Sequence, residues 1–527
     1  MTAVGRPVRP RPQLRLRAAV RAAPRRVPAA LTAPLGLLVL LALSAAVRTR
    51  GVNGPLWLDE GLSIGIASHH LSAIPALLRQ DGSPPLYYLL LHVWMAVAGR
   101  SETATHLLSV VFGLATVPVA WWFGRTLWGD RAAWACATLF ALDPALSFHS
   151  VETRMYSLEG LLTLLVAGAL VACFVQRRRG FAWLQAGALA ALLYTHNWGL
   201  FLFACAAVVG AVLVALGPDR RGLARDAAIA FGVPVLAYLP WVPTLLFQAR
   251  HTGAPWSSEP GLYDLLRVRV YLLGTPIPVT AMLIAAVTAA FALARRGPRL
   301  ERRAALVLAA VTAGTLLLAW GYNQHASGWA SRYLSVLLGP GLLLGGLLIA
   351  RAGVTGLAAI VLIAVPWLHQ PDYRSVAHKS NVRYLAHRVT PRLRPGDLIL
   401  DAQPESVPVV RYYFGPAYRY ASPLGPYPDT GIMDWRDVLA RMRATTVRGT
   451  VALADHLRPG TRVAVLLPLI KRHPGNAAWT RLVRARAVRL AHALGRDPRL
   501  RWVMRVHAGR HGSKTTLRAV VYARRRT

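Results

Sequence analysis

The sequence is short of acidic residues and of charge in general. Aspartate and glutamate number 22 against 61 lysines and arginines, and charged residues make up 16% of the 527 positions. Hydrophobic residues reach 54% and the mean hydropathy is +0.38, values too apolar for an ordinary soluble chain of this length. This composition predicts that most of the chain lies in lipid.

Cysteine is also scarce, and the three that occur, Cys136, Cys173 and Cys205, all fall inside apolar runs. Their placement offers neither a disulfide framework nor a metal-ligand spacing. No stretch resembles a nucleic-acid-binding fingerprint, and the net charge of +39 comes largely from a basic N-terminal tail, basic loops and the C-terminal region. We therefore expect no metal-ligand residues and no nucleic-acid partner, and leave open only a loosely bound divalent cation as cofactor.

The sequence contains many long apolar stretches. They recur from Pro34 to Trp367, and each is long enough to cross about 30 Å of hydrocarbon as a helix and too long for a barrel strand. The stretch at 84–94 either crosses or lies on the surface, and only the surface placement turns every basic loop inward. About eleven spans follow, at approximately 31–47, 104–127, 131–149, 157–175, 181–195, 198–216, 227–247, 276–294, 303–320, 333–350 and 353–368.

The orientation follows from the same charges. The tail at 1–30 is rich in arginine and lacks a convincing signal-peptide cleavage site, so we expect it to stay in the cytoplasm. Carboxylates and other polar residues then gather in the outward loops, and an odd number of spans places the C-terminus outside. The sequence thus predicts a multi-pass cell-membrane protein with a helical membrane domain at 31–368, whose first outer loop at 48–103 carries interfacial helices, and an extracytoplasmic domain at 369–527.

The C-terminal region has a different pattern, with short alternating runs broken by proline and glycine from about His369 onward. This is typical of a small α/β domain. Short strands are predicted at 398–400, 407–410, 463–467 and 519–522, and a basic amphipathic helix at 479–494. The helix is rich in arginine, which fits anionic lipid head groups, a polyanionic acceptor or simply a solvated face in a chain that almost always uses arginine rather than lysine.

Four polar segments stand out in the predicted outer loops. The first is an acidic pair beside the membrane boundary, in Leu56-Trp57-Leu58-Asp59-Glu60-Gly61. The others are the segments 81–88 (DGSPPLYY), 152–157 (ETRMYS) and 331–334 (SRYL). In a chain with so little acid, carboxylates gathered at one face are candidates for chemistry rather than scattered surface charge.

In their order and spacing, these four segments resemble the polytopic GT-C glycosyltransferases, in the bacterial branch similar to protein O-mannosyltransferases and the aminoarabinose transferase of lipid A. The resemblance covers residues 30 to about 350. It implies a polyprenyl-phosphate-linked sugar as donor and transfer on the outer side with inversion. The implied sugar is a mannose-like hexose or a pentose, and the acceptor is a hydroxyl of a protein, a glycolipid or a polysaccharide.

The resemblance and the chemistry together assign roles to the acidic pair. An acceptor hydroxyl that attacks a glycosyl carbon needs a carboxylate to take its proton, and we expect Asp59 to be this base. Glu60 is expected to support Asp59 electrostatically or to orient the acceptor. The alternative is that the pair caps a short interfacial helix at its positive N-terminal end.

Cations are needed for the leaving lipid phosphate. Glu152 and Arg154 are expected to meet the sugar hydroxyls and the phosphate, and Arg332, followed by Tyr333, to clamp the phosphate. The alternatives are an ion pair between Glu152 and Arg154 at a helix end, and an interfacial arginine at 332. Tyr156 completes the first group, either in the site or in the aromatic belt of the membrane interface.

Two further positions are weaker candidates for substrate binding, Asp81 and His196. Asp81 fits loop geometry equally well, and His196 fits a satisfied polar residue at a helix end. The sequence departs from the family pattern at Ser83, where relatives commonly carry histidine, and at His106, where they commonly carry arginine. A neutral His106 cannot serve a phosphate as an arginine does, which shifts weight to the arginines at 154 and 332.

Two other classes of protein share a many-helix architecture. A polyprenyl-lipid or sugar transporter or flippase is expected to place ionisable residues near mid-bilayer, in broken helices or repeated halves. A non-catalytic membrane assembly protein would use the membrane part as a scaffold for its outer domain. The gathering of carboxylates and arginines at one face favours the enzyme.

Overall fold

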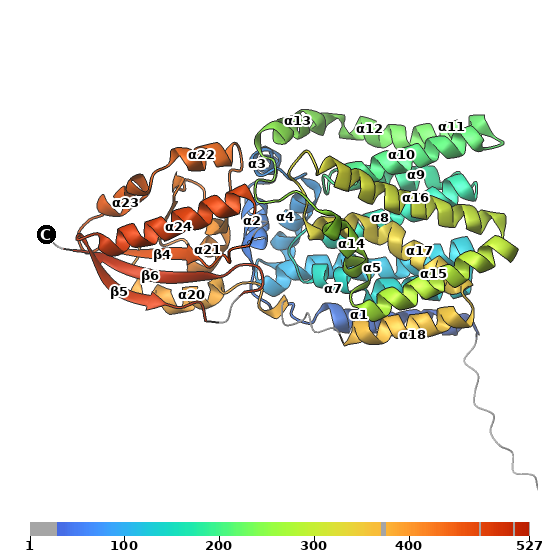
Figure 1. Cartoon of the computed structure of the whole chain (residues 1–527), viewed down its shortest axis with the longest axis horizontal. Helices are drawn as coiled ribbons and strands as arrows, with labels where there is room; N and C mark the ends of the chain where they lie inside the picture. Colours follow the sequence, from blue (N-terminus) through green and yellow to red (C-terminus); the bar gives the residue numbers. More distant parts are fainter. Residues whose placement is uncertain (1–28, 370–375, 474–475, 510–511, 526–527) are drawn as a thin grey trace, which may run out of the picture. The chain divides into compact units, whose positions relative to one another are not determined.

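The computed structural model describes residues 29–369, 376–473, 476–509 and 512–525, so most of the predicted basic tail lies outside the described residues. Residues 40–527 form one compact unit. Within it, a bundle of long helices precedes a six-stranded sheet, as expected for a mainly helical membrane protein with a C-terminal α/β region (Figure 1).

A helix occurs at each of the eleven expected spans. Their bounds are α1 Ala29–Arg48, α5 Glu102–Trp128, α6 Asp130–Leu142 with α7 Pro144–Ser150, α8 Tyr156–Leu170 with its π-helical end Val171–Val175, α9 Phe181–Leu193, α10 Gly199–Leu216, α11 Arg220–Ala227 with α12 Val233–Tyr238 and α13 Val242–His251, α15 Pro276–Arg296, α16 Arg299–Tyr322, the 3-10 helix Ser331–Leu337 with α17 Leu338–Arg351, and α18 Val354–Leu368.

Fewer of these helices are long enough by themselves to cross a membrane. Among the described residues, seven reach the necessary length and hydropathy: 102–128, 156–175, 199–216, 220–251, 276–296, 299–322 and 331–351. The span expected at 131–149 is broken at Asp143, whose side chain accepts the Leu146 N–H and caps α7. The break arises because Pro144 cannot continue the hydrogen-bond ladder of α6.

The segment 48–103, which the sequence predicts as the first outer loop, contains three short helices, α2 Leu58–Ala67, α3 Ile74–Asp81 and α4 Leu86–Ala98. The pair formed by α2 and by residues 71–81 is bent by 119°, and would add an eighth span if it were counted as one. With 13 residues, α4 reaches only about 20 Å, which is short of the roughly 30 Å of hydrocarbon. Its length fits a surface helix better than a span. A similar short helix, α14 Leu262–Leu273, lies between α13 and α15.

The C-terminal sheet has the strand order β3-β2-β1-β4-β6-β5. Its strands are β1 Leu398–Asp401, β2 Arg419–Ser422, β3 Gly425–Pro426, β4 Arg462–Pro468, β5 Leu500–Val506 and β6 Leu517–Arg524. β1 pairs in parallel with both β2 and β4, whereas β4, β6 and β5 pair antiparallel. The helices here are α20 Val382–Val389, α21 Val407–Phe414, α22 Val438–Ala444, α23 Val447–Asp455 and α24 Ala478–Arg496, and Figure 1 shows α24 lying along the sheet.

The predicted strands at 398–400, 463–467 and 519–522 are confirmed as β1, β4 and β6, and the basic helix as α24. The strand expected at 407–410 is wrong, because this segment begins α21. Pro408 stands in the first turn of that helix, where its missing N–H costs nothing and its fixed φ suits the helix. The run of valines, a β-forming signal, is overridden by packing against α2.

Two glycines let α2 approach the C-terminal region closely. A Cβ on Gly61 would lie 2.4 Å from the Cα of Val409 in α21, and a Cβ on Gly65 would lie 2.0 Å from the carbonyl oxygen of Gly431. Both neighbours are backbone atoms, which cannot turn aside as a side chain can. The path of α2, and with it the position of Asp59, therefore depends on glycine at these two places.

We expect Gly61→Ala to lower the unfolding temperature by several degrees, because the added methyl overpacks a helix contact at a cost of about 1–3 kcal/mol. The measurement is thermal unfolding of the purified protein in detergent. Gly187→Ala in α9 is the matched control, since a Cβ there meets nothing within 4 Å. Equal unfolding temperatures for the two variants would show that the close approach does not constrain α2.

Candidate functional site

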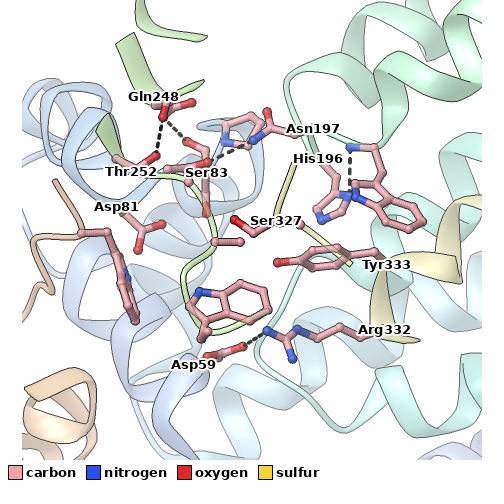
Figure 2. Close-up of a pocket in the computed structure, with 18 of the residues that line it drawn as sticks. Asp59, Asp81, Ser83, His196, Asn197, Gln248, Thr252, Ser327, Arg332 and Tyr333 are labelled. Carbon is pink, nitrogen blue, oxygen red and sulfur yellow. Dashed lines mark hydrogen bonds and ion pairs between the residues drawn. The ribbon is translucent and has the colours of Figure 1, made fainter. Parts of the chain in front are cut away.

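One cavity of about 600 Å³ collects most of the predicted site residues (Figure 2). Its wall is built by the first outer loop, the segments that precede α8 and α10, α13, the 3-10 helix at 331–337 and the C-terminal region. Six of the nine candidate residues line it: Asp59, Asp81, Arg154, His196, Arg332 and Tyr333. The outer polar segments, far apart in the sequence, thus meet at one place.

Asp59 stands in the first turn of α2 and faces this cavity. Its Oδ2 lies 3.5 Å from a terminal nitrogen of Arg332, and the side chain is 13% exposed. Within the described part of the chain, this oxygen has no hydrogen-bond partner. The carboxylate is therefore held beside a cation but still has a free acceptor position, as a base that takes a proton requires.

Arg332 lies among aromatic rings. Its guanidinium carbon is 4.7 Å from the ring centre of Trp256, 5.3 Å from that of Tyr333 and 5.7 Å from that of Trp57. Rings at such distances attract the cation and fix its position without neutralising it. Arg332 thus stands in the cavity wall as a fixed cation, with the Asp59 carboxylate 3.5 Å away.

Arg154 is the second cation of the wall and is 7% exposed. One terminal nitrogen donates to Ser63 Oγ at 3.1 Å, to Tyr88 Oη at 3.3 Å and to the Asp59 carbonyl at 3.5 Å. These partners are uncharged, so the charge of Arg154 is solvated by dipoles rather than cancelled by a carboxylate. The ion pair between Glu152 and Arg154, the alternative from the sequence, is replaced by other contacts of Glu152.

Three candidates complete this side of the cavity or its wall. The rings of His196 and Tyr333 are 4.6 Å apart, and Tyr156 packs behind them with its ring 5.9 Å from that of His196. His196 Nδ1 lies 3.1 Å from Oε1 of Glu159, a fully buried residue of α8. The sequence analysis did not select Glu159, because it falls inside an apolar run. The only signal for it there is that a carboxylate is rare in such a run.

Asp81 ends α3 and lines the cavity across from Arg332 (Figure 2). Burial raises the pKa of Asp81 to about 6, against the hydrogen bond from Ser83 and the nearby charge of Arg154, which both lower it. Ser83, the first departure from the family pattern, thus lies beside Asp81 in the same wall. A carboxyl group with a pKa near 6 can hold or give up a proton at neutral pH.

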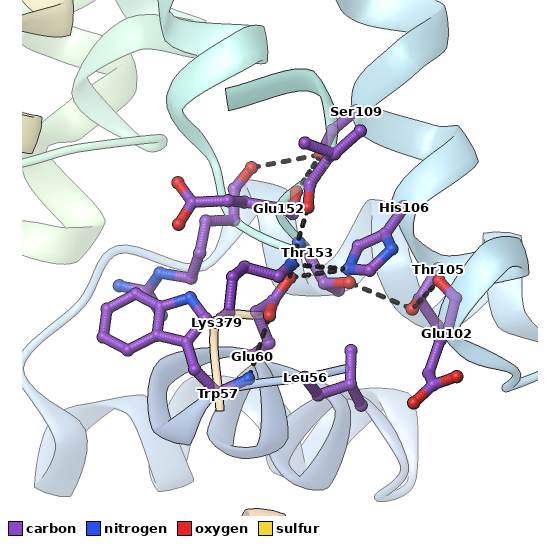
Figure 3. A network of polar contacts seen from close by, with 12 residues as sticks. Leu56, Trp57, Glu60, Glu102, Thr105, His106, Ser109, Glu152, Thr153 and Lys379 are labelled. Atoms are coloured by element: carbon purple, nitrogen blue, oxygen red, sulfur yellow. Dashed lines mark hydrogen bonds and ion pairs between the residues drawn. The ribbon is translucent and has the colours of Figure 1, made fainter. Parts of the chain in front are cut away.

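Glu60 is not among the residues that line the cavity and instead belongs to a network of polar contacts with His106, Thr153 and Lys379 (Figure 3). Its side chain is fully buried, and Oε1 lies 2.7 Å from Lys379 Nζ, 2.7 Å from His106 Nε2 and 2.8 Å from the Thr153 N–H. Oε2 accepts the Trp57 N–H at 3.0 Å, which caps α2. The structure corrects the expected contact of Glu60 with an acceptor, because protein donors already occupy its carboxylate. The capping alternative applies to Glu60.

Glu152 is likewise buried behind the wall. It pairs with Lys514 and with His149, whose Nδ1 lies 3.0 Å from Oε2. Burial raises the pKa of Glu152, but Lys514 and His149 outweigh that effect and hold the pKa far below its usual value. Glu152 therefore anchors the loop before α8 through Lys514 and His149, and it lies outside the cavity wall, whereas the sequence had placed it against sugar hydroxyls.

Lys379 and Lys514 pair with Glu60 and Glu152, two contacts that the sequence did not reveal. Lys379 is fully buried and also donates to the Val151 carbonyl at 2.7 Å, while Lys514 lies 4.1 Å from the ring centre of Trp57. They are two of only three lysines in the chain, the third being Lys471. The rarity of lysine was the one feature of the sequence that could have pointed to these two residues. Lys379 pairs with Glu60, and His106, the second departure from the family pattern, contacts the same carboxylate oxygen.

No group of three or more histidine, cysteine, aspartate or glutamate side chains could hold a metal ion in the described ranges. The positive charge beside Asp59 is the guanidinium of Arg332. The residues at hand supply a proton acceptor and two positive charges around one cavity, which suits chemistry on a hydroxyl and a phosphate.

We expect Lys379→Met to lower the unfolding temperature, because removing one partner of a buried ion pair costs about 3–5 kcal/mol. The double variant Lys379→Met with Glu60→Gln removes both charges and should recover most of that loss. The measurement is thermal unfolding in detergent, with Lys471→Met, which alters the exposed lysine, as the control. Losses that simply add in the double variant would contradict the pairing.

No family model matches the sequence, and no curated protein matches it. Among solved structures, ArnT, the aminoarabinose transferase, from Cupriavidus metallidurans in the apo state has a TM-score of 0.62 at 14% identity, over 93% of this chain and 98% of that one. The same protein bound to undecaprenyl phosphate gives 0.59 at 13% identity over the same shares. The archaeal oligosaccharyltransferase AglB from Archaeoglobus fulgidus, in complex with an inhibitory peptide and a dolichol-phosphate, gives 0.53 at 10% identity over 82% of this chain and 69% of that one. The chain therefore has the GT-C fold.

Proposed function

We propose that this protein is an inverting glycosyltransferase of the membrane. It moves a sugar, a mannose-like hexose or a pentose, from a polyprenyl phosphate to a hydroxyl of an acceptor on the extracytoplasmic side. The observation that carries the proposal is the Asp59 carboxylate, which faces the cavity. Its Oδ2 lies 3.5 Å from the Arg332 guanidinium and has no hydrogen-bond partner among the described residues.

The donor phosphate fits between Arg154, whose hydrogen bonds go to uncharged groups, and Arg332, whose guanidinium lies 3.5 Å from Asp59. A guanidinium matches phosphate oxygens in geometry and charge. The apolar residues Leu200, Phe201, Leu245 and Leu246 line the same cavity and suit the first units of a polyprenyl chain. The likeness to ArnT, a structure of which holds undecaprenyl phosphate, supports this class of donor.

In the proposed reaction, a carboxylate oxygen of Asp59 takes the proton of the acceptor hydroxyl as its oxygen attacks the anomeric carbon. The bond between that carbon and the phosphate oxygen breaks, and its electron pair stays on the polyprenyl phosphate. Arg154 and Arg332 stabilise the negative charge that develops on the phosphate. A single displacement from the face opposite the phosphate inverts the anomeric centre.

The shared cavity also helps to distinguish a transferase from a transporter and from a non-catalytic scaffold. Asp59, Arg154 and Arg332 line one cavity and lie at or just before the N-terminal ends of α2, α8 and the 3-10 helix at 331–337, rather than spread along a path through the bundle. A transporter is expected to place such groups near mid-bilayer, and a scaffold has no need of an unpaired carboxylate beside two arginines. Both arguments support the transferase.

Asp59→Asn should abolish sugar transfer, by at least about a hundredfold, because the amide cannot accept the proton of the attacking hydroxyl. The measurement is incorporation of label from radiolabelled polyprenyl-phosphate mannose and polyprenyl-phosphate arabinose in membranes that contain the protein. Asp130→Asn, at an exposed carboxylate, is the matched control. Undiminished incorporation by Asp59→Asn would remove Asp59 from the chemistry.

Arg332→Gln should weaken the binding of undecaprenyl phosphate about tenfold or more, since a charge-assisted contact to phosphate is lost while the aromatic wall stays. Native mass spectrometry or calorimetry on the purified protein measures this affinity directly. Arg267→Gln removes an exposed arginine outside the cavity wall and serves as the control. An unchanged affinity in Arg332→Gln would place the phosphate elsewhere.

A further inference from the structure

In the C-terminal sheet, the chain leaves β1 toward β2 on one side and later adds β4 on the other side of β1. The order of the parallel strands therefore reverses at β1. β1 pairs in parallel with β2 on one side and with β4 on the other. In open α/β sheets, ligands bind beyond the carboxyl ends of the strands at such a point. The segment that leaves β1 at this end, residues 402–406, is thus where the fold itself favours a ligand site.

Two polar residues of this segment, Gln403 and Glu405, line the cavity that also holds Asp59. Glu405 is 8% exposed, and its Oε2 has no hydrogen-bond partner in the described ranges, while Oε1 accepts from Gln403 Nε2 at 3.0 Å. Burial raises the pKa of Glu405. A buried carboxyl group with an unpaired oxygen is costly unless a ligand or water meets it.

Two indole rings stand next to these polar groups. Trp435 and Trp479 line the cavity with their ring centres 5.6 Å apart and their planes at 66°. Among the described residues, the indole N–H of Trp479 makes no hydrogen bond of full geometry, but it lies near the Glu405 carboxyl group and lowers the pKa of that group. Flat apolar ring faces beside carboxyl and amide groups are what a sugar ring needs, because its C–H face is apolar and its rim carries hydroxyl groups.

The charge of this part of the wall argues for a neutral ligand. The sheet region contributes Gln403, Glu405, Trp435, Trp479 and Thr480 to the cavity, and no cation is among them. The arginines Arg481, Arg484, Arg486 and Arg489 of α24, which the sequence suggested for a polyanionic acceptor, are not in the cavity wall. An anionic acceptor would meet only the Glu405 carboxyl group at this end, which is unfavourable.

We propose that the C-terminal region forms a subsite for a neutral carbohydrate, which holds the acceptor beside Asp59 through Gln403, Glu405, Trp435 and Trp479. The assignment of this subsite to the acceptor rests on the proposed function, in which the protein is a glycosyltransferase. The acceptor of the transferase is accordingly a sugar hydroxyl of a polysaccharide or glycolipid, with the donor phosphate at the arginine end of the cavity and the acceptor glycan at the sheet end.

The test is direct binding to the full-length protein in detergent, which requires no turnover. The probes are neutral oligosaccharides of mannose, glucose, galactose, arabinose and N-acetylglucosamine, with a serine- and threonine-rich peptide and a phosphorylated glycolipid head group for comparison. Thermophoresis and tryptophan fluorescence report the affinities. The variants are Glu405→Gln and Trp435→Leu, with Trp502→Leu as the control, since this tryptophan is 58% exposed on the edge strand β5.

We expect at least one neutral oligosaccharide to bind, and both cavity variants to weaken it about tenfold while Trp502→Leu leaves it unchanged. Unfolding temperatures of all variants separate lost binding from lost folding. Binding of the peptide or the phosphorylated head group alone, or of no probe, overturns the subsite. An equal effect of Trp502→Leu overturns it as well. Oligosaccharide binding by a protein that transfers no sugar would leave the subsite standing and refute the transferase.

Discussion

The buried ion pair between Lys379 and Glu60 is the interaction on which the site depends. Both side chains are fully buried, so each charge is tolerable only because the other neutralises it at 2.7 Å. Glu60 also caps α2 and accepts the backbone N–H of Thr153, which ties the first outer loop to the segment before α8. Asp59 is the neighbour of Glu60 on the same helical turn, so its position in the cavity follows from this anchor.

Adjacent carboxylates can do different work because a helix turns by about 100° per residue. Glu60 points into the protein, where four donors surround it. Asp59 points into the cavity, where its Oδ2 lies beside Arg332 and has no hydrogen-bond partner among the described residues. The sequence motif thus places a cavity-facing carboxylate, Asp59, directly before a buried structural anchor, Glu60. Glu152 and Arg154 differ in the same way. Glu152 is buried and paired with Lys514, whereas Arg154 lines the cavity and its hydrogen bonds go to neutral groups.

The helix bundle and the C-terminal region form one functional unit through these contacts. Both lysines that neutralise the outer-loop carboxylates come from beyond the last membrane helix, and Gly61 and Gly65 bring α2 against that region. The cavity wall combines arginines from the bundle with indoles and a carboxyl group from the sheet side. A cavity with a cationic end and a neutral polar end suits two substrates of different charge.

The sequence by itself determined the class of protein, the positions of the helices, three strands of the sheet and six residues of the cavity wall. These follow from the length of apolar runs and from local chemistry, both of which act over short stretches of chain. Only the tertiary structure decided that Glu60 is an anchor, that residues 407–410 start a helix and that the partner of Glu60 lies 319 positions away. Such outcomes depend on contacts between distant segments, and no local pattern specifies which buried cation will reach which carboxylate.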